Sequence, residues 1–426
     1  MASLNPGQQK TFLEMVNFIN DDTQQFMDVD GGPGTGKTFL ISKTADGILD
    51  HKKPGSPLHT VGITATTNKA AAVLADAMPH RAGEIGTIYS FMNLRLKENW
   101  NTGETSVVPV EKAWVIHSGM VIIVDEDSMI NKDLFKWLVA GIDSTCKVIF
   151  VGDRDQLAPV KEAISPIFEQ GYKSSRLTQP VRNAEQPALM DLCKQLRETV
   201  KTGIFTPIVE VPGVIDFITG AELQGVLQRE FFEENPNKRV LSYTNSRVID
   251  YNLYIRQLRG YVNPFEVGEI VSNNQSAELP GKERLYTDQV VRVKKILVDE
   301  ESDTLIKGIP LRMVTMVVED VMSKFTYEVT SFANPDDRKN AMKYFADRNN
   351  WSKYFNIKNK FPDLRSVAAS TTHKAQGSTY DIVIVDLADI GKCTNSDQTA
   401  RMQYVAMSRP KTRLYIRGKL PDRYFE

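Results

Sequence analysis

Residues 26–38 read FMDVDGGPGTGKT. A short apolar stretch leads into the glycine loop Gly31-x-x-x-x-Gly36-Lys37-Thr38, and apolar side chains recur at helical spacing over the residues that follow. Strand, glycine loop and helix therefore come in the order that a P-loop requires. The alternative is a glycine-rich turn that only precedes a lysine, and the flanking strand and helix favour the P-loop. The sequence thus predicts an α/β fold built around a phosphate-binding loop.

The residue types of this loop suit a nucleoside triphosphate bound with Mg²⁺. Glycines such as Gly34 and Gly36 let successive backbone N–H groups turn toward a polyphosphate, and the helix N-terminus adds positive potential. Lys37 can reach the β and γ phosphates, while the hydroxyl of Thr38 can bind Mg²⁺. We therefore expect ATP or GTP, together with Mg²⁺, as cofactors.

Length and composition limit the classes of protein to consider. The chain has 426 residues, of which 41% are hydrophobic and 25% are charged. This length predicts about two to four domains. No apolar run is long enough to cross a bilayer and the N-terminus lacks a secretory signal, so we expect no membrane partner.

Charge and cysteine usage narrow the setting further. Cys146, Cys193 and Cys393 are odd in number and far apart, which is typical of a reducing compartment such as the cytoplasm and argues against a metal cluster. The formal net charge of −1 argues against a protein that coats nucleic acid indiscriminately. Any contact with a phosphate backbone must come from a local groove.

The α/β pattern recurs along the chain, with two interruptions. Further strands are expected near residues 61–66, 120–124, 147–151, 239–245, 382–386 and 414–417. Residues 95–113 interrupt the first group and predict a β-hairpin that carries Trp100. Residues 263–363 interrupt the second group, first with valine-rich, partly alternating stretches that suggest a small antiparallel barrel, and from residue 336 with a helical, aromatic segment.

Acidic and amide side chains follow two of the expected strands. Asp125 and Glu126 end the apolar run 120–124, where Asp125 can hold Mg²⁺ and Glu126 can orient or deprotonate the attacking water. Gln156 follows the next strand and can sense a γ-phosphate or its water. Arg182 and Arg409 are two candidates to stabilise the charge of phosphoryl transfer, although chemistry alone does not single them out among the arginines.

Five motifs taken together resemble the ordered motifs of the superfamily one helicases. They are GGPGTGKT at residue 31, VDEDSM at 124, GDRDQLAPV at 152, STTHKAQG at 370 and YVAMSRP at 404. The motifs at 152 and 370 point to the branch that contains RecD and Dda. The resemblance implies an α/β fold with two RecA-like P-loop domains, a pin hairpin inserted in the first, and a small β-barrel plus helical tower inserted in the second.

The resemblance also implies domain ranges and residue roles. The first RecA-like domain would span 1–175 with the pin at about 95–113, the second 176–262 and 364–426, and the inserted domain 263–363. The implied ATP site comprises Gln8 as the adenine-reading glutamine, Gly34, Gly36, Lys37, Thr38, Asp125, Glu126, Gln156, Arg182, Gln376, Gly377 and Arg409. Lys37, Glu126, Gln156, Arg182 and Arg409 would be catalytic, and Thr38 and Asp125 would hold the metal. The implied DNA contacts are Thr67, Asn68, Thr87, Tyr89, Trp100, Thr244, Asn245, Thr371 and His373.

Several alternatives stay open. Hydroxyl and amide side chains of this kind hold phosphates without reading sequence, but each of them alone is as well explained as a helix cap or turn residue. Trp100 is equally well explained as a strand-separating residue or as part of its own domain. The aromatic and basic residues of 336–365 favour a structural role over single-strand binding. Three departures from the family pattern are Thr66, where relatives have proline, Asp127, a third acid near the metal, and Pro180, which precedes Val181-Arg182.

The expected function is an ATP-dependent DNA helicase. By resemblance, ATP would lie in the cleft between two domains and the protein would translocate 5′ to 3′ on single-stranded DNA and unwind duplex or forked DNA as a monomer, with single-strand-binding or replication proteins as candidate partners. An ATP-gated single-strand clamp without unwinding is one rival. A metabolic P-loop kinase is another, which the motifs after residue 150 disfavour.

Overall fold

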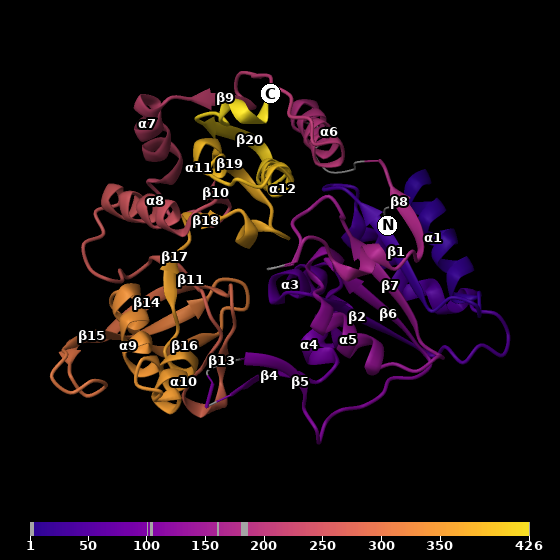
Figure 1. The fold of residues 1–426 in the computed structure, drawn as a ribbon, viewed down its shortest axis with the longest axis horizontal. Coiled ribbons are helices and arrows are strands. Elements are labelled where there is room, and N and C mark those ends of the chain that lie inside the picture. Colours follow the sequence, from indigo (N-terminus) through magenta and orange to yellow (C-terminus); the bar gives the residue numbers. More distant parts are fainter. Residues whose placement is uncertain (1–3, 100, 103–104, 160–161, 180–185, 426) are drawn as a thin grey trace. The chain divides into compact units, whose positions relative to one another are not determined.

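The computed structural model describes residues 4–99, 101–102, 105–159, 162–179 and 186–425 (Figure 1). Backbone contacts divide the chain into two compact units. The first unit holds residues 1–96, 107–217 and 372–426, and the second holds residues 97–106 and 218–371. The domain ranges inferred from the family resemblance stay a prediction beside this division.

The first unit is built on a six-stranded sheet whose order is β3-β2-β6-β7-β1-β8. Its strands are β1 Phe26–Gly31, β2 Thr60–Ala65, β3 Gly86–Thr87, β6 Met120–Asp125, β7 Lys147–Gly152 and β8 Lys173–Leu177. All printed pairings are parallel, with Val29 opposite Val151 and Val124 opposite Phe150. The carboxyl ends of the strands therefore share one edge, where open α/β sheets bind their ligands.

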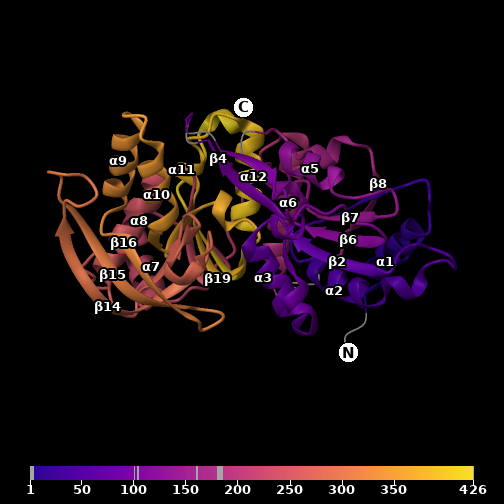
Figure 2. The same cartoon turned by 90° about the horizontal axis from the view of Figure 1, so that it is seen from below.

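Both faces of this sheet are covered, which explains the continuous apolar runs of its strands. Side chains on one face of the sheet, such as Val121 and Ile123, pack with helices α1 Pro6–Ile19, α2 Lys37–Gly47 and α3 Asn68–Ala77. The alternate side chains Ile122 and Val124 pack with α4 Ile88–Phe91 and α5 Lys132–Ala140. Figure 2 shows α2 and α5 on opposite sides of these strands. The core consequently has two layers around one sheet.

The other elements of the first unit come mainly from the later part of the chain. They are η1 Ile48–His51, η2 Pro79–Glu84, η3 Asp127–Met129, η4 Pro166–Glu169, α6 Pro187–Thr202, η6 His373–Ala375, β19 Tyr380–Asp386, α11 Leu387–Ile390, α12 Ser396–Met407, β20 Pro410–Arg417 and η7 Asp422–Tyr424. β19 and β20 pair in parallel, with Val383 opposite Leu414. β9 Ile215–Ile218 ends at the boundary between the units.

The second unit contains a parallel strand pair and an antiparallel sheet. β10 Lys238–Ser242 pairs in parallel with β18 Ala369–Thr371, and helices α7 Gly220–Phe231 and α8 Asn245–Leu258 flank β10 in sequence. The antiparallel sheet has the order β16-β15-β14-β11-β17, and β12 pairs with β13. Their bounds are β11 Ile270–Asn273, β12 Ala277–Glu278, η5 Pro280–Lys282, β13 Arg284–Leu285, β14 Val290–Ser302, β15 Leu311–Asp320, β16 Thr326–Phe332 and β17 Leu364–Ser366.

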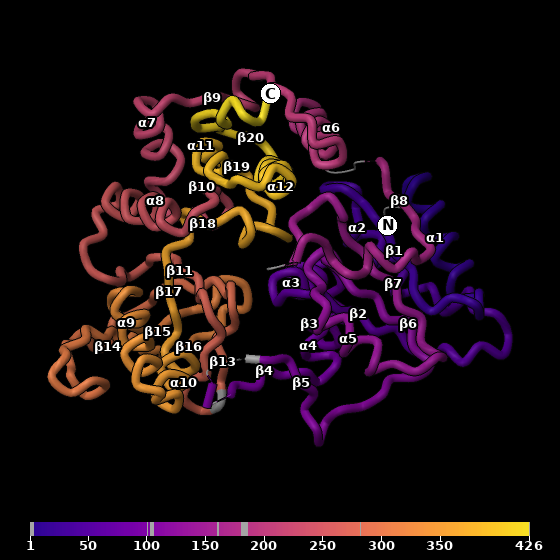
Figure 3. Tube along the Cα trace, viewed as in Figure 1, coloured from indigo at the N-terminus to yellow at the C-terminus, as the bar shows by residue number. Residues whose placement is uncertain are grey.

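The aromatic segment forms two helices, α9 Pro335–Ala346 and α10 Trp351–Lys360, between β16 and β17 (Figure 3). Phe345 and Phe355 are buried, at 5% and 1% exposure. Phe345 and Ile357 pack with Phe332 of β16 in one apolar cluster. The structural role favoured for these aromatic residues therefore agrees with their packing, while the names barrel and tower, with the roles that they imply, stay predictions.

A two-stranded sheet lies where the sequence predicts a hairpin. It consists of β4 Leu94–Glu98 and β5 Thr105–Pro109, and the side chain of Asn99 accepts the N–H groups of Asn101 and Thr102 at 3.0 and 3.3 Å. Glu98 contacts α10, with its carboxylate 3.4 Å from Lys358 Nζ and 2.9 Å from Asn359 Nδ2. Trp100 lies outside the described residues, and its strand-separating role stays a hypothesis.

No helix in the described part of the chain is both long enough and apolar enough to cross a membrane.

Candidate nucleotide site and nucleic-acid face

The glycine loop leaves β1 at the carboxyl edge of the sheet and enters α2. Gly34 and Gly36 have φ values of 75° and 80°, a conformation that side chains with a Cβ rarely adopt. Gly36 precedes the helix without a side-chain cap, so the first N–H groups of α2 keep their polarity for a ligand. Lys37 Nζ donates to the carbonyl oxygens of Gly31 and Gly32 at 2.6 and 3.3 Å. The loop thus has the form of an anion cradle.

A cavity of about 680 Å³ opens over this loop. Its lining unites predicted residues from five separate motifs, namely Gly34, Gly36, Lys37, Thr38, Asp125, Glu126, Gln156, Gly377 and Arg409. Pro33, Phe39, Ser42, Lys69, Ala70, Val73, Ala77, Ser378, Thr379, Ser408 and Lys411 complete it. All of these residues belong to the first unit.

Asp125 and Glu126 end β6 beside the loop. Burial and the neighbouring Glu126 charge raise the pKa of Asp125 to about 7, against the opposing effect of Lys37. A divalent cation at this carboxylate would favour its ionised form. Glu126 has φ 57° and ψ 49°, a left-handed conformation that is costly for a residue with a side chain and that often marks a functional position.

Two buried acceptor atoms at this site have no hydrogen-bond partner within the described residues. They are Glu126 Oε2 and Gln156 Oε1, while Gln156 Nε2 donates to Asp153 Oδ2 at 3.3 Å. Buried polar atoms are rarely left unpaired, so these two point to a water or ligand donor. Together with the glycine cradle, Lys37 and the Asp125 carboxylate, they fit a nucleoside triphosphate with Mg²⁺ and an attacking water.

Arg409 reaches the cavity from the end of α12. It is 5% exposed, and its Nε and Nη1 donate to the carbonyl oxygens of Val405 and Ser378 at 2.8 and 3.1 Å. Gly377 has φ 72°, and a Cβ at this position would lie 3.4 Å from Glu126 Oε1. A buried guanidinium, a carboxylate and the P-loop lysine therefore line one polar cavity, an arrangement suited to phosphoryl transfer.

Comparisons with known proteins agree with this geometry. The sequence pattern of an AAA domain matches residues 3–205, and that of a UvrD-like helicase C-terminal domain matches residues 366–416. The ATP-dependent DNA helicase Dda of enterobacteria phage T4 is 25% identical over 418 aligned residues, covering 89% of this chain and 91% of Dda. The chain is similar to the superfamily one helicases. Its relationship to Dda was predicted from the motifs and is confirmed.

Solved structures show that the fold is shared. One similar structure shows two coordinating Pif1 helicases that unwind forked double-stranded DNA. It has a TM-score of 0.54 and 16% identity, and the match covers 100% of this chain and 94% of the Pif1 chain. Pif1 helicase from Bacteroides, solved with ADP-AlF3 and single-stranded DNA, has a TM-score of 0.51 and 15% identity, with the same coverage. The predicted α/β class with parallel sheets of the RecA-like kind is confirmed.

Two described residues carried over from the superfamily one pattern, Gln8 and Gln376, do not line the cavity. Gln8 caps α1 together with Asn5, and its Nε2 donates to the carbonyl oxygen of Thr35 at 3.2 Å. Gln376 Nε2 donates to Ser128 Oγ at 2.9 Å and to Leu157 O at 3.3 Å. Arg182 lies outside the described residues. Their roles in nucleotide binding stay predictions.

Most of the residues that the resemblance predicts to contact DNA lie at the start of helices that follow strand ends. Thr67, Thr87 and Thr244 each accept a backbone N–H three residues on, at 3.1, 3.2 and 3.3 Å, so the capping role is real. An accepting hydroxyl still has a proton to donate to a phosphate. Asn68 and Asn245 are exposed first residues of α3 and α8.

The same edges bring these residues together within each unit. In the first unit Ala65 pairs with Thr87, which places the ends of β2 and β3 side by side. Tyr89 is half-buried, and burial followed by the charge of Asp133 raises its pKa. In the second unit Thr371 pairs with Ser242 near Thr244.

His373 faces helix α12 in the first unit. Its Nε2 lies 3.5 Å from Gln398 Nε2, and burial lowers its pKa. The imidazole is therefore neutral at neutral pH and would act as a hydrogen-bonding group rather than as a cation.

Thr66 is a site residue that the sequence flagged only as a departure from a proline. Its N–H donates to Asp125 O at 3.3 Å, and its Oγ1 donates to Glu126 O at 3.1 Å. Proline could make neither bond, since it lacks both groups. Thr66, which directly precedes Thr67, is therefore bonded to both acidic residues of the cavity.

Asp127 directly follows the acidic pair of the cavity and packs against Gly152 at the end of β7. It is absent from the cavity lining and fully buried behind β7, where a Cβ added to Gly152 would lie 1.8 Å from its Oδ1. Burial, then the charges of Asp28 and Asp30, raise its pKa well above the ordinary range. The interpretation of Asp127 as a third acid near the metal stays a prediction, while its close packing against Gly152 gives it a structural role.

This close approach makes Gly152 sensitive to substitution. We expect Gly152→Ala to lower the free energy of unfolding by about 1–3 kcal/mol, because the fully buried Asp127 has no room to move. Urea unfolding monitored by tryptophan fluorescence measures this change in the free energy of unfolding. Gly225→Ala is the control, because no atom lies within 4 Å of that Cβ in helix α7 and alanine favours a helix by about 0.5–1 kcal/mol. Equal stability of Gly152→Ala and the unaltered chain would contradict this packing.

Proposed function

We propose that this chain is an ATP-dependent DNA helicase that translocates 5′ to 3′ on single-stranded DNA and unwinds duplex DNA. The observation that carries the proposal is the single cavity that unites Lys37, Glu126, Gln156 and Arg409 from four motifs. Dda, which this chain resembles over most of its length, is named as an ATP-dependent DNA helicase. The proposal keeps the domain ranges 1–175, 176–262 with 364–426, and 263–363.

The residues of the cavity have separate tasks in ATP hydrolysis. The backbone N–H groups of Gly34 to Thr38 and the ammonium group of Lys37 bind the phosphates, and Thr38 and Asp125 hold Mg²⁺, which supplies charge neutralisation. Glu126 orients the attacking water and accepts its proton, with Gln156 as the second hydrogen-bonding partner. Arg409 stabilises charge at the γ-phosphate with its planar fork of donors.

DNA binding would use the sheet edges described above. Hydroxyl, amide and backbone N–H groups hold phosphates without reading sequence, as movement along any strand requires. In the first unit the contacts that Thr66 makes to Asp125 and Glu126 give a direct route from the neighbouring Thr67 to the cavity. Occupancy of the strand site and the geometry of hydrolysis would thereby be coupled.

The test uses matched duplexes that carry either a 5′ or a 3′ single-stranded tail, with ATP and Mg²⁺. We expect strand release from the 5′-tailed substrate and little from the 3′-tailed one. Release from the 3′-tailed substrate alone would reverse the polarity. DNA-stimulated hydrolysis without strand release from either substrate would favour the ATP-gated single-strand clamp, for which the same cavity would serve.

A further inference from the structure

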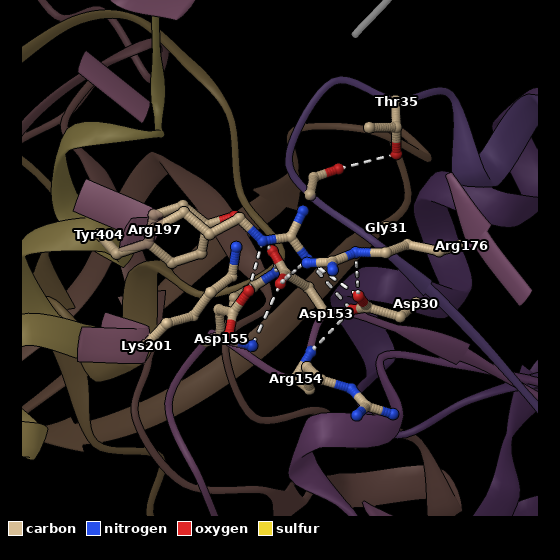
Figure 4. Close-up of polar contacts among 12 residues, drawn as sticks. Asp30, Gly31, Thr35, Asp153, Arg154, Asp155, Arg176, Arg197, Lys201 and Tyr404 are labelled. Atoms are coloured by element: carbon tan, nitrogen blue, oxygen red, sulfur yellow. Dashed lines mark hydrogen bonds and ion pairs between the residues drawn. The ribbon is translucent and has the colours of Figure 1, made fainter. Parts of the chain in front are cut away.

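Arg197 of helix α6 occupies a partly buried position that none of the sequence motifs includes. Its Nη2 lies 3.0 Å from Asp30 Oδ2 at the end of β1 and 3.6 Å from Asp153 Oδ1 after β7, and its Nε donates to Asp155. The side chain is 15% exposed, and the three carboxylates are 8% exposed or less. Figure 4 shows these carboxylates around the guanidinium. One cation therefore ties the end of β1, where the glycine loop begins, to the loop that follows β7.

The same guanidinium also packs against Gly32 of the P-loop. A Cβ added to Gly32 would lie 3.0 Å from Arg197 Nη1 and 3.3 Å from Tyr404 Oη, so both side chains touch the loop backbone. The carbonyl oxygen of Gly32 accepts from Lys37 Nζ at 3.3 Å and from Thr35 Oγ1 at 2.8 Å. Gly32 therefore links Arg197 to Lys37, because it contacts the guanidinium and accepts a hydrogen bond from the lysine.

Side chains of helix α12 bind residues 153–156, the loop that carries Gln156. Tyr404 Oη donates to Asp153 Oδ2 at 2.8 Å, and the same oxygen accepts from Gln156 Nε2 at 3.3 Å. Arg401 Nη1 donates to the carbonyl oxygens of Arg154 and Gln156 at 2.7 and 2.9 Å. Arg401 of α12 therefore positions the backbone of Gln156, and Tyr404 of α12 positions its side chain through Asp153. Arg409 lies two residues beyond the end of the same helix.

The charges explain why arginine is required at this position. Burial disfavours the guanidinium charge, but the carboxylates of Asp153 and Asp30 outweigh it and raise the pKa of Arg197. Burial likewise raises the pKa of Asp153, against the effects of Lys37 and Arg197. A planar fork can contact three carboxylates at once, whereas an ammonium group acts as a point charge. Within the described residues no cluster of acids here is arranged to hold a metal ion instead.

We propose that Arg197 is a positioning residue for ATP hydrolysis, which holds the P-loop and the Gln156 loop at a fixed separation. Arg197 is absent from the lining of the cavity and acts through Lys37 and Gln156, so that both meet the same phosphate. This inference rests on the proposed ATPase function of the cavity. Displacement of either loop by about 1 Å would lower the rate about 100-fold without removing any group that binds the nucleotide.

The test compares Arg197→Met with Arg176→Met in the full chain. Arg176 is the matched control because its Nε also pairs with Asp30, at 3.2 Å, from a side chain that is 47% exposed. We expect Arg197→Met to lower kcat for ATP about 100-fold while the Kd of a fluorescent ADP analogue changes less than about threefold. Arg176→Met should stay within about twofold of the unaltered chain. Arg197→Lys should give an intermediate kcat, because it restores charge but not the fork.

Tyr404→Phe keeps the inference testable if Arg197→Met does not fold. This change removes one hydroxyl and leaves no buried cation unpaired, and we expect a kcat about tenfold lower with unchanged ADP binding. An unaltered kcat in folded Arg197→Met, or in Tyr404→Phe when Arg197→Met fails to fold, would overturn the inference. So would equal losses of kcat and ADP affinity, which indicate general damage to the site. Because the readout is basal ATPase activity, failure of the unaltered chain to unwind DNA would remove the helicase proposal alone.

Discussion

Lys37→Ala is expected to lower kcat for ATP hydrolysis about 10³-fold while single-stranded DNA binding remains measurable. The ammonium group lies in the glycine cradle, where it donates to the carbonyl oxygens of Gly31 and Gly32, and a small movement carries it to a bound phosphate. Removal of one preorganised donor at a site of developing charge typically costs about 10²–10³ in rate. Loss of a phosphate ligand from the nucleotide itself increases the effect. Steady-state phosphate release and fluorescence anisotropy of a labelled oligonucleotide measure the two activities.

The matched control for this change is Lys10→Ala. Lys10 lies on α1 with a side chain that is 79% exposed, and its distance of 3.9 Å to Glu14 describes a weak surface pair. Its replacement should leave both activities within about twofold. Undiminished hydrolysis in Lys37→Ala would remove the P-loop from the mechanism. Complete loss of DNA binding would show that the strand site depends on the lysine as well.

The parts of the fold that were predictable are those encoded by local sequence. The apolar runs of β6 and β7 predicted strands buried on both faces, because such runs have no polar alternation. The glycine loop between β1 and α2 predicted where β1 ends. Asp125 marked the end of β6, and Gln156 followed the end of β7. Since parallel strands share their carboxyl edge, these groups had to meet. Lys37, Asp125 and Gln156 accordingly line one cavity, and Arg409 lines it as the family resemblance implied.

The parts that were missed depend on side chains that are distant in sequence. Arg197 pairs with Asp30 across 167 positions of the chain, and nothing local distinguishes it from other arginines. Asp127 follows the acidic pair directly, yet its fully buried side chain occupies the space that the missing Cβ of Gly152 leaves. Spacing along the chain cannot reveal on which side of a turn a carboxylate lies.

Thr66 shows how a departure from a family pattern becomes informative. The sequence showed only that a fixed turn was missing, since proline would restrict φ there. The structure shows a gain, because the N–H and hydroxyl of Thr66 bind the carbonyl oxygens of both acidic residues. Glu126 has a left-handed backbone that needs support from its surroundings. Thr66 therefore supports the left-handed backbone of Glu126, the residue predicted to act on the attacking water, by a bond from the residue that follows β2.

Arg409→Ala is expected to lower kcat about 10³-fold or more, with nucleotide binding reduced far less. An arginine that stabilises the transferred phosphoryl group typically contributes about 10³–10⁵ to the rate, because the charge it meets develops in the transition state. Arg409 is 5% exposed and is held by the carbonyl oxygens of Val405 and Ser378, so it is preorganised at the cavity wall. Single-turnover hydrolysis, compared with the Kd of a non-hydrolysable ATP analogue, separates the two effects.

Two further variants identify which property of Arg409 matters. Arg409→Lys keeps the charge but loses the fork, so most of the defect should remain if bidentate contact stabilises the transition state. Arg413→Gln is the matched control on the adjoining strand β20, because Arg413 pairs with Asp216 at 2.8 Å and does not line the cavity. Full activity in Arg409→Lys would reduce the role of this residue to electrostatics alone. Equal loss of rate and of analogue affinity in Arg409→Ala would mean that Arg409 binds the ground state, and the charge of the transition state would then depend on another cation.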